Sequence, residues 1–312
     1  MIALPDRCPP QRAGTLFRFH LPADTYAVSA VLVFLISATL LLCWWRSFHV
    51  PAGDACRTAA LVAVLLAGAA YYRGRGEESF VLCLGSLAQV VAFAASYLAL
   101  MYVVATLAHP LVDARLAAFD DWCNLTAPAA RQWAEAHPAI ATLLAISYDT
   151  LLYQTALVVI VLGLGNDRRR LSAFVLAFML AAIVAVGLFA LLPAAGPFVT
   201  YGFAPSADQA TYLDHFRSLR DGSRTAVDFR CAEGLITFPS FHVAWAILLT
   251  WAFRGRRSTF IAALLVNSLV IVSTMTTGWH YFADVLGGAG VAVGAIAFVA
   301  WLRSWRANEN VA

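Results

Sequence analysis

The sequence predicts an all-α membrane protein, a polytopic bundle of about eight transmembrane helices. Three observations support this prediction. Hydrophobic residues make up 61% of the 312 residues, and charged residues make up only 12%, which is about half of their share in soluble domains. The apolar residues also gather in runs of about the twenty residues that a helix needs to cross a bilayer. A soluble domain cannot bury so much apolar surface, whereas lipid covers it.

Eight apolar runs are long enough to be considered as spans. They cover approximately residues 26–45, 57–72, 79–107, 139–164, 171–193, 238–254, 259–277 and 282–302. The second and sixth runs are short, and the third is long enough to tilt. The first run follows Arg7, Arg12 and Arg18, much as the apolar core of a signal peptide follows its basic residues. It is too long for a typical signal core, however, and Trp44-Trp45-Arg46 is typical of an interfacial anchor. We therefore expect a retained span.

The arginines predict the orientation of the bundle. The net charge is +3, and because the sequence contains no lysine every basic residue is an arginine. Arginines follow the even-numbered runs, at Arg73, Arg75, Arg168, Arg169, Arg170, Arg254, Arg256, Arg257, Arg303 and Arg306. The positive-inside rule then places both termini in the cytoplasm and the odd-numbered exits in the periplasm or an equivalent lumen. This charge is a topology signal and not a nucleic-acid footprint. An alanine- and arginine-rich composition is typical of a GC-rich genome, so we expect a bacterial inner membrane.

Segment 111–136 is too polar to cross a membrane. Its apolar residues recur at helical spacing, at Val112, Leu116, Phe119 and Cys123. This spacing predicts an amphipathic helix on the outer interface, although a solvated loop helix fits equally well. Cys123 here and Cys231 in the long outer loop 194–237 could pair, but the sequence does not give their separation.

Two motifs contain candidate catalytic residues. Phe238-Pro239-Ser240-Phe241-His242 opens the sixth run, where proline and serine are helix-start residues. Taken alone, a capped helix with an interfacial histidine explains it. Thr277-Gly278-Trp279-His280-Tyr281-Phe282-Ala283-Asp284 leads into the eighth run. His280 and Asp284 share one helix face, so the carboxylate can hold the proton of one ring nitrogen and leave the other nucleophilic. An interfacial hydrogen-bonded pair and a metal site of His242, His280 and Asp284 are the alternatives.

Topology joins the two motifs. The sixth and eighth runs both begin on the outer side, so His242 and His280 should lie at one membrane depth, each near a helix N-terminus. Helix N-termini offer unpaired N–H groups and a partial positive charge, which favour a phosphate group. The sequence therefore predicts phosphoryl chemistry on a lipid.

Together the two motifs resemble the type 2 phosphatidic acid phosphatase superfamily, and most closely its inositol phosphorylceramide synthase-like (inositolphosphotransferase) branch. The resemblance covers about residues 80–300. It implies a six-span catalytic domain over 79–305, preceded by an N-terminal segment 1–78 with two additional spans and followed by a cytoplasmic tail 306–312.

The resemblance also implies a role for each motif residue. His280 would attack phosphorus and form a phosphohistidine, and Asp284 would orient and charge-stabilise it. His242 would protonate the leaving oxygen and then activate the acceptor. Ser240 and Gly278 would lie against the phosphate. This mechanism needs no metal or other cofactor.

The sequence departs from the superfamily at its cationic positions. The usual motif of a lysine followed seven residues later by Arg-Pro is absent, Met275 replaces the arginine before the nucleophile, and Phe241 replaces a glycine. Transition-state charge still needs cations. Loop 194–237 offers Arg217, Arg220, Arg224 and Arg230. Arg220-Asp221-Gly222 resembles a loop motif of the same branch, so we expect Arg220 first and Arg224 second to bind phosphate. A solvated or headgroup-facing charge is the alternative for each.

A polar stripe marks the outer half of the fourth run, at Ser147, Tyr148, Asp149, Tyr153 and Gln154. Asp149 either lines a headgroup pocket or pairs with an outer-loop arginine. Gly196-Pro197 and Tyr201-Gly202 either shape a turn over the site or simply end a helix.

The sequence thus predicts a membrane enzyme that transfers or hydrolyses a lipid phosphate or phospho-headgroup at the periplasmic face. Phe241 and Met275 favour headgroup transfer of the inositolphosphotransferase type. A phosphatidate or polyprenyl-phosphate phosphatase is one alternative, and a non-catalytic lipid binder or transporter is another. The expected partners are a phospholipid or lipid-phosphate substrate and membrane lipids, not nucleic acid, and the oligomeric state stays open.

Overall fold

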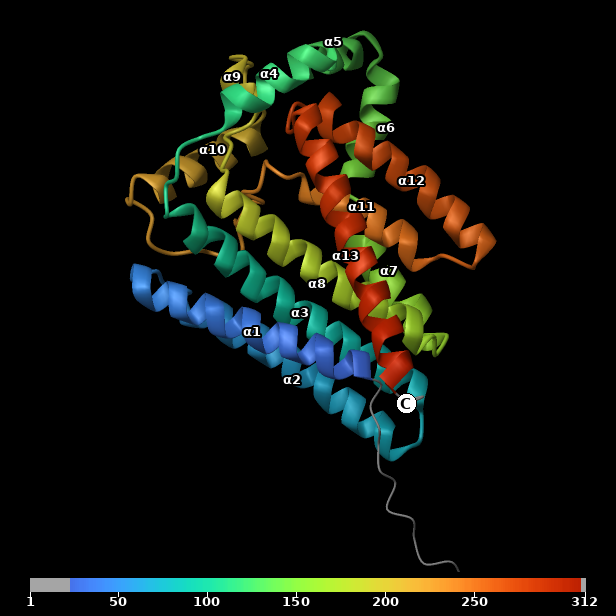
Figure 1. Cartoon of the computed structure of the whole chain (residues 1–312). Helices are drawn as coiled ribbons and strands as arrows, with labels where there is room; N and C mark the ends of the chain where they lie inside the picture. The colour runs from blue at the N-terminus through green and yellow to red at the C-terminus, as the bar shows by residue number, and fades with distance from the viewer. Residues whose placement is uncertain (1–22, 310–312) are drawn as a thin grey trace, which may run out of the picture.

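The computed structural model describes residues 23–309, so the prediction that rests on Arg7, Arg12 and Arg18 lies outside the described residues. Within that range the chain forms thirteen α-helices and no β-strand, apart from an isolated bridge between His49 and Ala226. The helices assemble into an elongated bundle with short helices gathered at one end (Figure 1). The predicted all-α membrane bundle is therefore confirmed.

Six helices of the described range are long and apolar enough to span a membrane. They correspond to the first, second, third, fifth, seventh and eighth predicted runs. Their bounds are α1 Ala23–Arg46, α2 Ala52–Gly74, α3 Glu78–Ala105, α8 Arg168–Leu191, α12 Arg257–Thr276 and α13 Phe282–Glu309.

The fourth predicted run is not one straight helix. It is divided into α6 (Pro138–Tyr148) and α7 (Leu151–Leu164), which meet at an angle of 50°. Neither proline nor glycine lies at the break. Instead, the Thr150 hydroxyl donates to the Ser147 carbonyl at 2.6 Å, and the Gln154 amide donates to that hydroxyl at 2.9 Å. These bonds satisfy polar groups at a point where lipid could not.

The sixth predicted run is shorter than expected. α11 (Phe241–Ala252) has 12 residues, too few to cross alone. The residues before it form a turn over 237–240, where the Ser240 N–H donates to the Asp284 carbonyl in the first turn of α13 at 3.0 Å. The expected count of about eight spans is therefore corrected to six in the described chain, or seven if α6 and α7 together make one, with α11 as a short additional helix.

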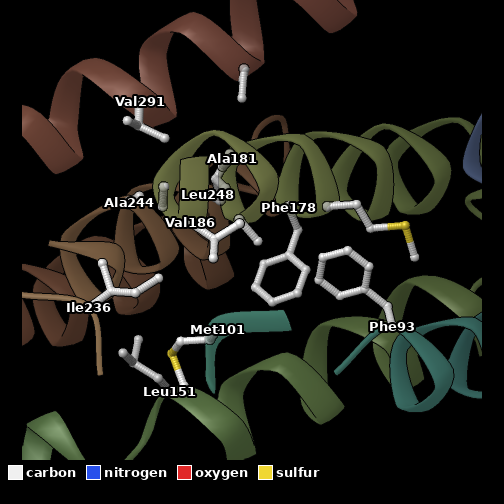
Figure 2. Close-up of a cluster of buried hydrophobic side chains, with 14 of the residues drawn as sticks. Phe93, Met101, Leu151, Phe178, Ala181, Val186, Ile236, Ala244, Leu248 and Val291 are labelled. Atoms are coloured by element: carbon white, nitrogen blue, oxygen red, sulfur yellow. The ribbon is translucent and has the colours of Figure 1, made fainter. Parts of the chain in front are cut away.

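The core of the bundle lies around α8. Of the candidate spans, α8 has the most buried apolar window, and it packs against α1, α3, α11 and α13. Its Phe178 meets Phe93 of α3 with ring centroids 5.8 Å apart (Figure 2). α1 and α2 both pack on α3.

Segment 111–136 forms two helices, α4 (Asp113–Cys123) and α5 (Ala127–Ala136), and the long loop contains α9 (Pro197–Thr200) and α10 (Ala207–Arg220). These four helices lie at the end of the bundle where α13 begins (Figure 1). Cys123 and Cys231 are both free thiols, so the structure contains no bond between them.

Candidate active site

His280 lies in the short link between α12 and α13. Its Nδ1 atom is 3.0 Å from the Thr237 carbonyl oxygen and 3.2 Å from Asp284 Oδ2. Both neighbours are acceptors, so Nδ1 holds a proton and Nε2 keeps its lone pair. The His280 side chain is 3% exposed, and this burial lowers the pKa of the ring to about 4, although the Thr237 carbonyl acts in the opposite direction. At neutral pH the ring is therefore uncharged and able to act as a nucleophile.

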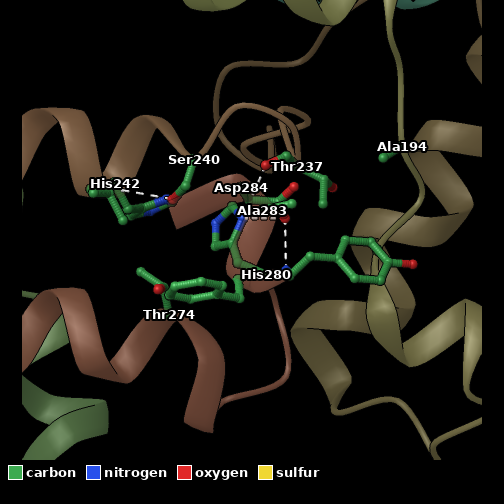
Figure 3. Close-up of polar contacts among 12 residues, drawn as sticks. Ala194, Thr237, Ser240, His242, Thr274, His280, Ala283 and Asp284 are labelled. Atoms are coloured by element: carbon green, nitrogen blue, oxygen red, sulfur yellow. Dashed lines mark hydrogen bonds and ion pairs between the residues drawn. The ribbon is translucent and has the colours of Figure 1, made fainter. Parts of the chain in front are cut away.

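Asp284 is held in the first turn of α13. Its Oδ2 atom also accepts a hydrogen bond of 2.8 Å from the Tyr281 backbone N–H. The residue is fully buried, and among the described residues its Oδ1 atom has no hydrogen-bond partner. The predicted four-residue pairing of His280 with Asp284 is thus present in the structure (Figure 3).

His242 faces this pair from α11. Its ring centroid lies 5.9 Å from that of His280. The ring stacks on Tyr148 at 4.3 Å, and the Tyr148 hydroxyl is 3.2 Å from His242 Nδ1. Because Tyr148 ends α6, the break between α6 and α7 positions this second histidine.

Ser240 joins the two motifs. Its hydroxyl caps α11 by accepting from the Val243 N–H at 3.4 Å, and its own N–H donates to the Asp284 carbonyl at 3.0 Å. α13 approaches closely here, since a Cβ atom on Gly288 would lie 2.2 Å from the Ser240 carbonyl oxygen. Only glycine permits this approach, which brings the two histidine-bearing segments together.

Both histidines line a cavity of about 480 Å³. Its wall also contains three carboxylate residues, Asp149, Asp208 and Glu233, and no arginine of the described chain. Asp149 therefore lies in the wall of the cavity, as one of the two sequence-based alternatives expected. Burial, followed by the charge of Asp208, raises the pKa of Glu233.

Comparison with known proteins agrees with these motifs. A family model described as the PAP2 superfamily matches residues 114–298, more than half of the chain. The chain belongs to the PAP2 superfamily. The matched range begins in α4 and includes both histidines and Asp284, and membership indicates phosphatase or phosphotransferase activity on lipid-like phosphates. No curated protein and no solved structure matches the chain. Because the match starts at residue 114, the expected domain boundaries at 79 and 305 stay predictions.

In this PAP2 protein the arginines expected at the phosphate lie outside the histidine cavity. Arg220 donates to the His109 carbonyl at 2.8 Å and lies over the Phe216 ring. Arg224 pairs with Asp214 at 3.0 Å. Arg217 and Arg220 line a separate cavity of about 490 Å³, and Arg230 pairs with Asp228. The structure does not place Arg220 or Arg224 at the histidine cavity. Phosphate binding by these two residues stays a prediction.

The other two residues that were predicted to bind phosphate, Ser240 and Gly278, have hydrogen-bond partners within the protein. Ser240 is fully buried in its capping role. Gly278 has φ +78°, in the region that favours glycine, and its N–H donates to the Met275 carbonyl at 3.0 Å. Both residues shape the site by their backbone conformation.

Arg131 of α5 is a cation that the sequence analysis missed. Its Nη1 atom lies 4.0 Å from the position that a Cβ atom on Gly278 would take. It lines a cavity of about 580 Å³ that shares Ser206 and Thr277 with the histidine cavity. Its ion pair with Glu135 joins two partly or mostly exposed side chains, so that pair is weak and exchangeable. Its position on a polar outer helix gave no signal of this proximity.

Two carboxylates of α4 were also missed. Asp120 is fully buried and accepts from the N–H groups of Phe282 and Ala283 at 2.7 and 2.9 Å. Asp113 accepts from the Gly196 N–H at 2.8 Å and from the Tyr281 hydroxyl at 3.0 Å. α4 thus turns these carboxylates toward the site. The available signal was their spacing of seven residues, which places both on one helix face.

A metal site of His242, His280 and Asp284 was one alternative from the sequence. The described residues contain no group of three or more His, Cys, Asp or Glu arranged to hold a metal ion.

Proposed function

We propose that the protein is a membrane enzyme that moves a lipid-linked phosphoryl group through a phosphohistidine formed on His280. One observation carries the proposal. Two acceptors hold the Nδ1 proton of a buried, neutral His280 beside a cavity that a second histidine also lines. A buried histidine in a purely structural role has no need of an open cavity or of a facing histidine.

The proposed reaction has two steps. In the first, Nε2 of His280 attacks phosphorus and the bond from phosphorus to the leaving oxygen breaks. His242, protonated once the anionic phosphate lies beside it, donates its extra proton to that oxygen. In the second, an acceptor hydroxyl attacks phosphorus, the P–N bond breaks, and His242 takes the acceptor's proton. The Asp284 carboxylate, hydrogen-bonded at Nδ1, stabilises the positive charge that the His280 ring carries in between.

The lining of the cavity supports headgroup transfer over phosphatase activity. A phosphate monoester brings close to two negative charges at neutral pH, which the three cavity carboxylates would repel. A phosphodiester brings one charge, and hydroxyl or amine groups on its headgroup can donate to those carboxylates. This agrees with the resemblance to the inositolphosphotransferase branch and favours a phospholipid donor.

The proposed site faces the periplasm of a bacterial inner membrane. Support comes from the arginines that follow α7 and α11 and from those in the last turns of α13, because Arg170, Arg254 and Arg303 line one cavity at the end of α13 remote from His280. Under the positive-inside rule that end is cytoplasmic.

Product identification tests the proposal. Purified protein in liposomes is given phosphatidylinositol or phosphatidate, each labelled at phosphorus, with water, diacylglycerol or ceramide as acceptor. We expect a new phosphodiester from phosphatidylinositol, absent with His280→Ala and retained with His137→Ala, a histidine of the same end that hydrogen-bonds to the Trp133 carbonyl. Free phosphate from phosphatidate and inositol phosphate from phosphatidylinositol as the only products, with every acceptor, would replace transfer by hydrolysis. Absence of both turnover and an acid-labile phosphohistidine would leave a lipid binder.

A further inference from the structure

A second cavity lies at the opposite end of the bundle from His280. It measures about 670 Å³ and is formed by the start of α8, the turn between α11 and α12, and the last turns of α13. Asp284 and Arg303 both belong to α13, and the 19 residue steps from one to the other correspond to about 28 Å of helix. The cavity is therefore separate from the proposed catalytic site, and nothing in the proposed reaction uses it.

The cavity is lined by four arginines and one carboxylate. The arginines are Arg169, Arg170, Arg254 and Arg303, and the carboxylate is Asp167. The pKa of Arg254 is lowered to about 10, first by burial and then by the charges of Arg303, Arg170 and Arg169, while the charge of Asp167 acts in the opposite direction. Like charges gathered in a partly buried space repel one another. Arginines that only mark topology would turn away into water.

Backbone and side-chain contacts hold these arginines in position. Arg254 lies 3.6 Å above the Trp251 ring, and its Nη1 donates to the Trp251 carbonyl at 2.9 Å. Arg303 Nη2 donates to the Arg169 carbonyl at 2.8 Å. These contacts mean that the positive charge is concentrated before any ligand arrives.

Gly255 makes room for the remaining guanidinium. Its φ is +82°, and a Cβ atom there would lie 2.4 Å from Arg170 Nη2. Arg170 also donates to Asp167 at 3.0 Å. A side chain at 255 would push Arg170 away, so the turn after α11 is shaped to hold this charge at the cavity.

One wall of the cavity is apolar and is formed by the short helix α11 and the candidate span α13. It consists of Trp251, Ile296, Val299 and Ala300. A free phosphate ion would leave that wall unused, whereas an acyl chain would cover it. Basic pockets between transmembrane helices on the cytoplasmic side suit anionic lipid headgroups.

We propose that this basic cavity binds the phosphate of an anionic phospholipid from the leaflet opposite to the catalytic site, with the acyl chain along α13. Arg254 follows α11, and Arg303 lies near the end of the candidate span Phe282–Trp305 of α13. The bound lipid therefore joins the far ends of the two helices that carry His242 and Asp284.

Thermal unfolding of the full-length protein in a neutral detergent tests the site without any assay of turnover. Phosphatidylglycerol is titrated against phosphatidylcholine with the same acyl chains, and against inorganic phosphate. We expect a saturable rise in melting temperature with phosphatidylglycerol alone. Arg254→Gln and Arg170→Gln should each weaken the apparent affinity about tenfold, since each removes a charged hydrogen-bond donor.

Arg75→Gln is the matched control. Arg75 is an exposed arginine at the end of α2, and its guanidinium carbon lies 5.7 Å from the centroid of the Tyr71 ring. The control substitution therefore removes the same charge and a similar ring contact at a place outside the cavity. If Arg254→Gln does not fold, Arg169→Gln replaces it, because Arg303 donates to the backbone carbonyl of Arg169, which the substitution keeps. An equal response of all variants, or an equal effect of phosphatidylcholine, overturns the proposal. A full shift with inorganic phosphate alone overturns its lipid part.

Discussion

The Asp120 carboxylate accepts a hydrogen bond of 2.7 Å from the backbone N–H of Phe282, the first residue of α13. The two residues are 162 positions apart in sequence. The first N–H groups of a helix lack partners within it. Here a carboxylate from α4 is the acceptor for two of them, the N–H groups of Phe282 and Ala283. The start of α13, and with it Asp284, is therefore fixed by a residue outside both histidine motifs.

Asp120→Ala should lower activity without removing any group proposed to react. Two partly buried N–H groups lose their acceptor, which costs up to about 1–3 kcal/mol each when left unsatisfied. A shift of about 1 Å at His280 lowers turnover by roughly a hundredfold. The neighbouring Asp121→Ala is the control, because Asp121 is exposed. Melting temperature and kcat, measured on both variants, check this; equal kcat values would contradict the positioning role.

His280→Ala should abolish turnover while the protein still folds and inserts. Loss of the nucleophile removes the covalent step, whereas His242→Ala removes proton transfer, which is typically worth 10²–10⁴-fold. Acid-labile phosphorylation of the protein, followed by mass spectrometry after rapid quenching, should locate phosphate on residue 280 in the wild type only. Labelling that persists in His280→Ala would move the nucleophile elsewhere.

Acid should destabilise the wild type more than His280→Gln. Because burial lowers the pKa of His280 from its usual 6.5 to about 4, the unfolded chain binds a proton between these values that the folded chain does not bind. The free energy of unfolding therefore does not change through His280 titration above pH 6.5. It declines as the pH falls toward 4, by on the order of 3 kcal/mol. Chemical unfolding of both proteins from pH 7.5 to 4 measures this. Parallel curves would show that His280 is readily protonated when folded.

Arg131→Gln should reduce activity more than Arg220→Gln or Arg224→Gln. Arg131 lies beside Gly278, while the other two are bonded to His109 and Asp214. Removing a cation that stabilises transition-state charge typically costs a hundredfold or more, and we expect at least tenfold in kcat/KM for Arg131. Steady-state kinetics on the three variants give the ranking. The reverse order would support the expectation drawn from the Arg220-Asp221-Gly222 motif.

Gly288→Ala should separate α11 from α13, because its Cβ atom would lie 2.2 Å from the Ser240 carbonyl oxygen. Overpacking of this kind costs about 1–3 kcal/mol, and the distance between His242 and His280 should change with it. Gly290→Ala is the matched control, since a Cβ atom there meets nothing within 4 Å. We expect a lower melting temperature and lower kcat for the first variant only.

Much of the fold and the His280–Asp284 pair could be predicted because both depend on local spacing. Apolar runs reveal spans, and a four-residue interval puts two side chains on one helix face. The break at Asp149 could not be predicted, since no proline or glycine marks it. The burial of Asp113 and Asp120 could not be predicted, because polar residues of a surface helix usually face water. The two carboxylates instead accept from backbone N–H groups far along the chain. The position of Arg131 depends in the same way on tertiary packing.

The bend between α6 and α7 has a consequence for how substrate arrives. Tyr148 and Asp149 at the bend line the catalytic cavity, while Ile146, one turn earlier, is 60% exposed on the outer side of α6. For the proposed lipid substrate, we expect the headgroup to reach His280 beside this short helix while its acyl chains stay among their neighbours, with no extraction of the lipid. The enzyme's velocity should then follow the mole fraction of substrate within the bilayer, falling on surface dilution with inert lipid even when the bulk concentration is unchanged.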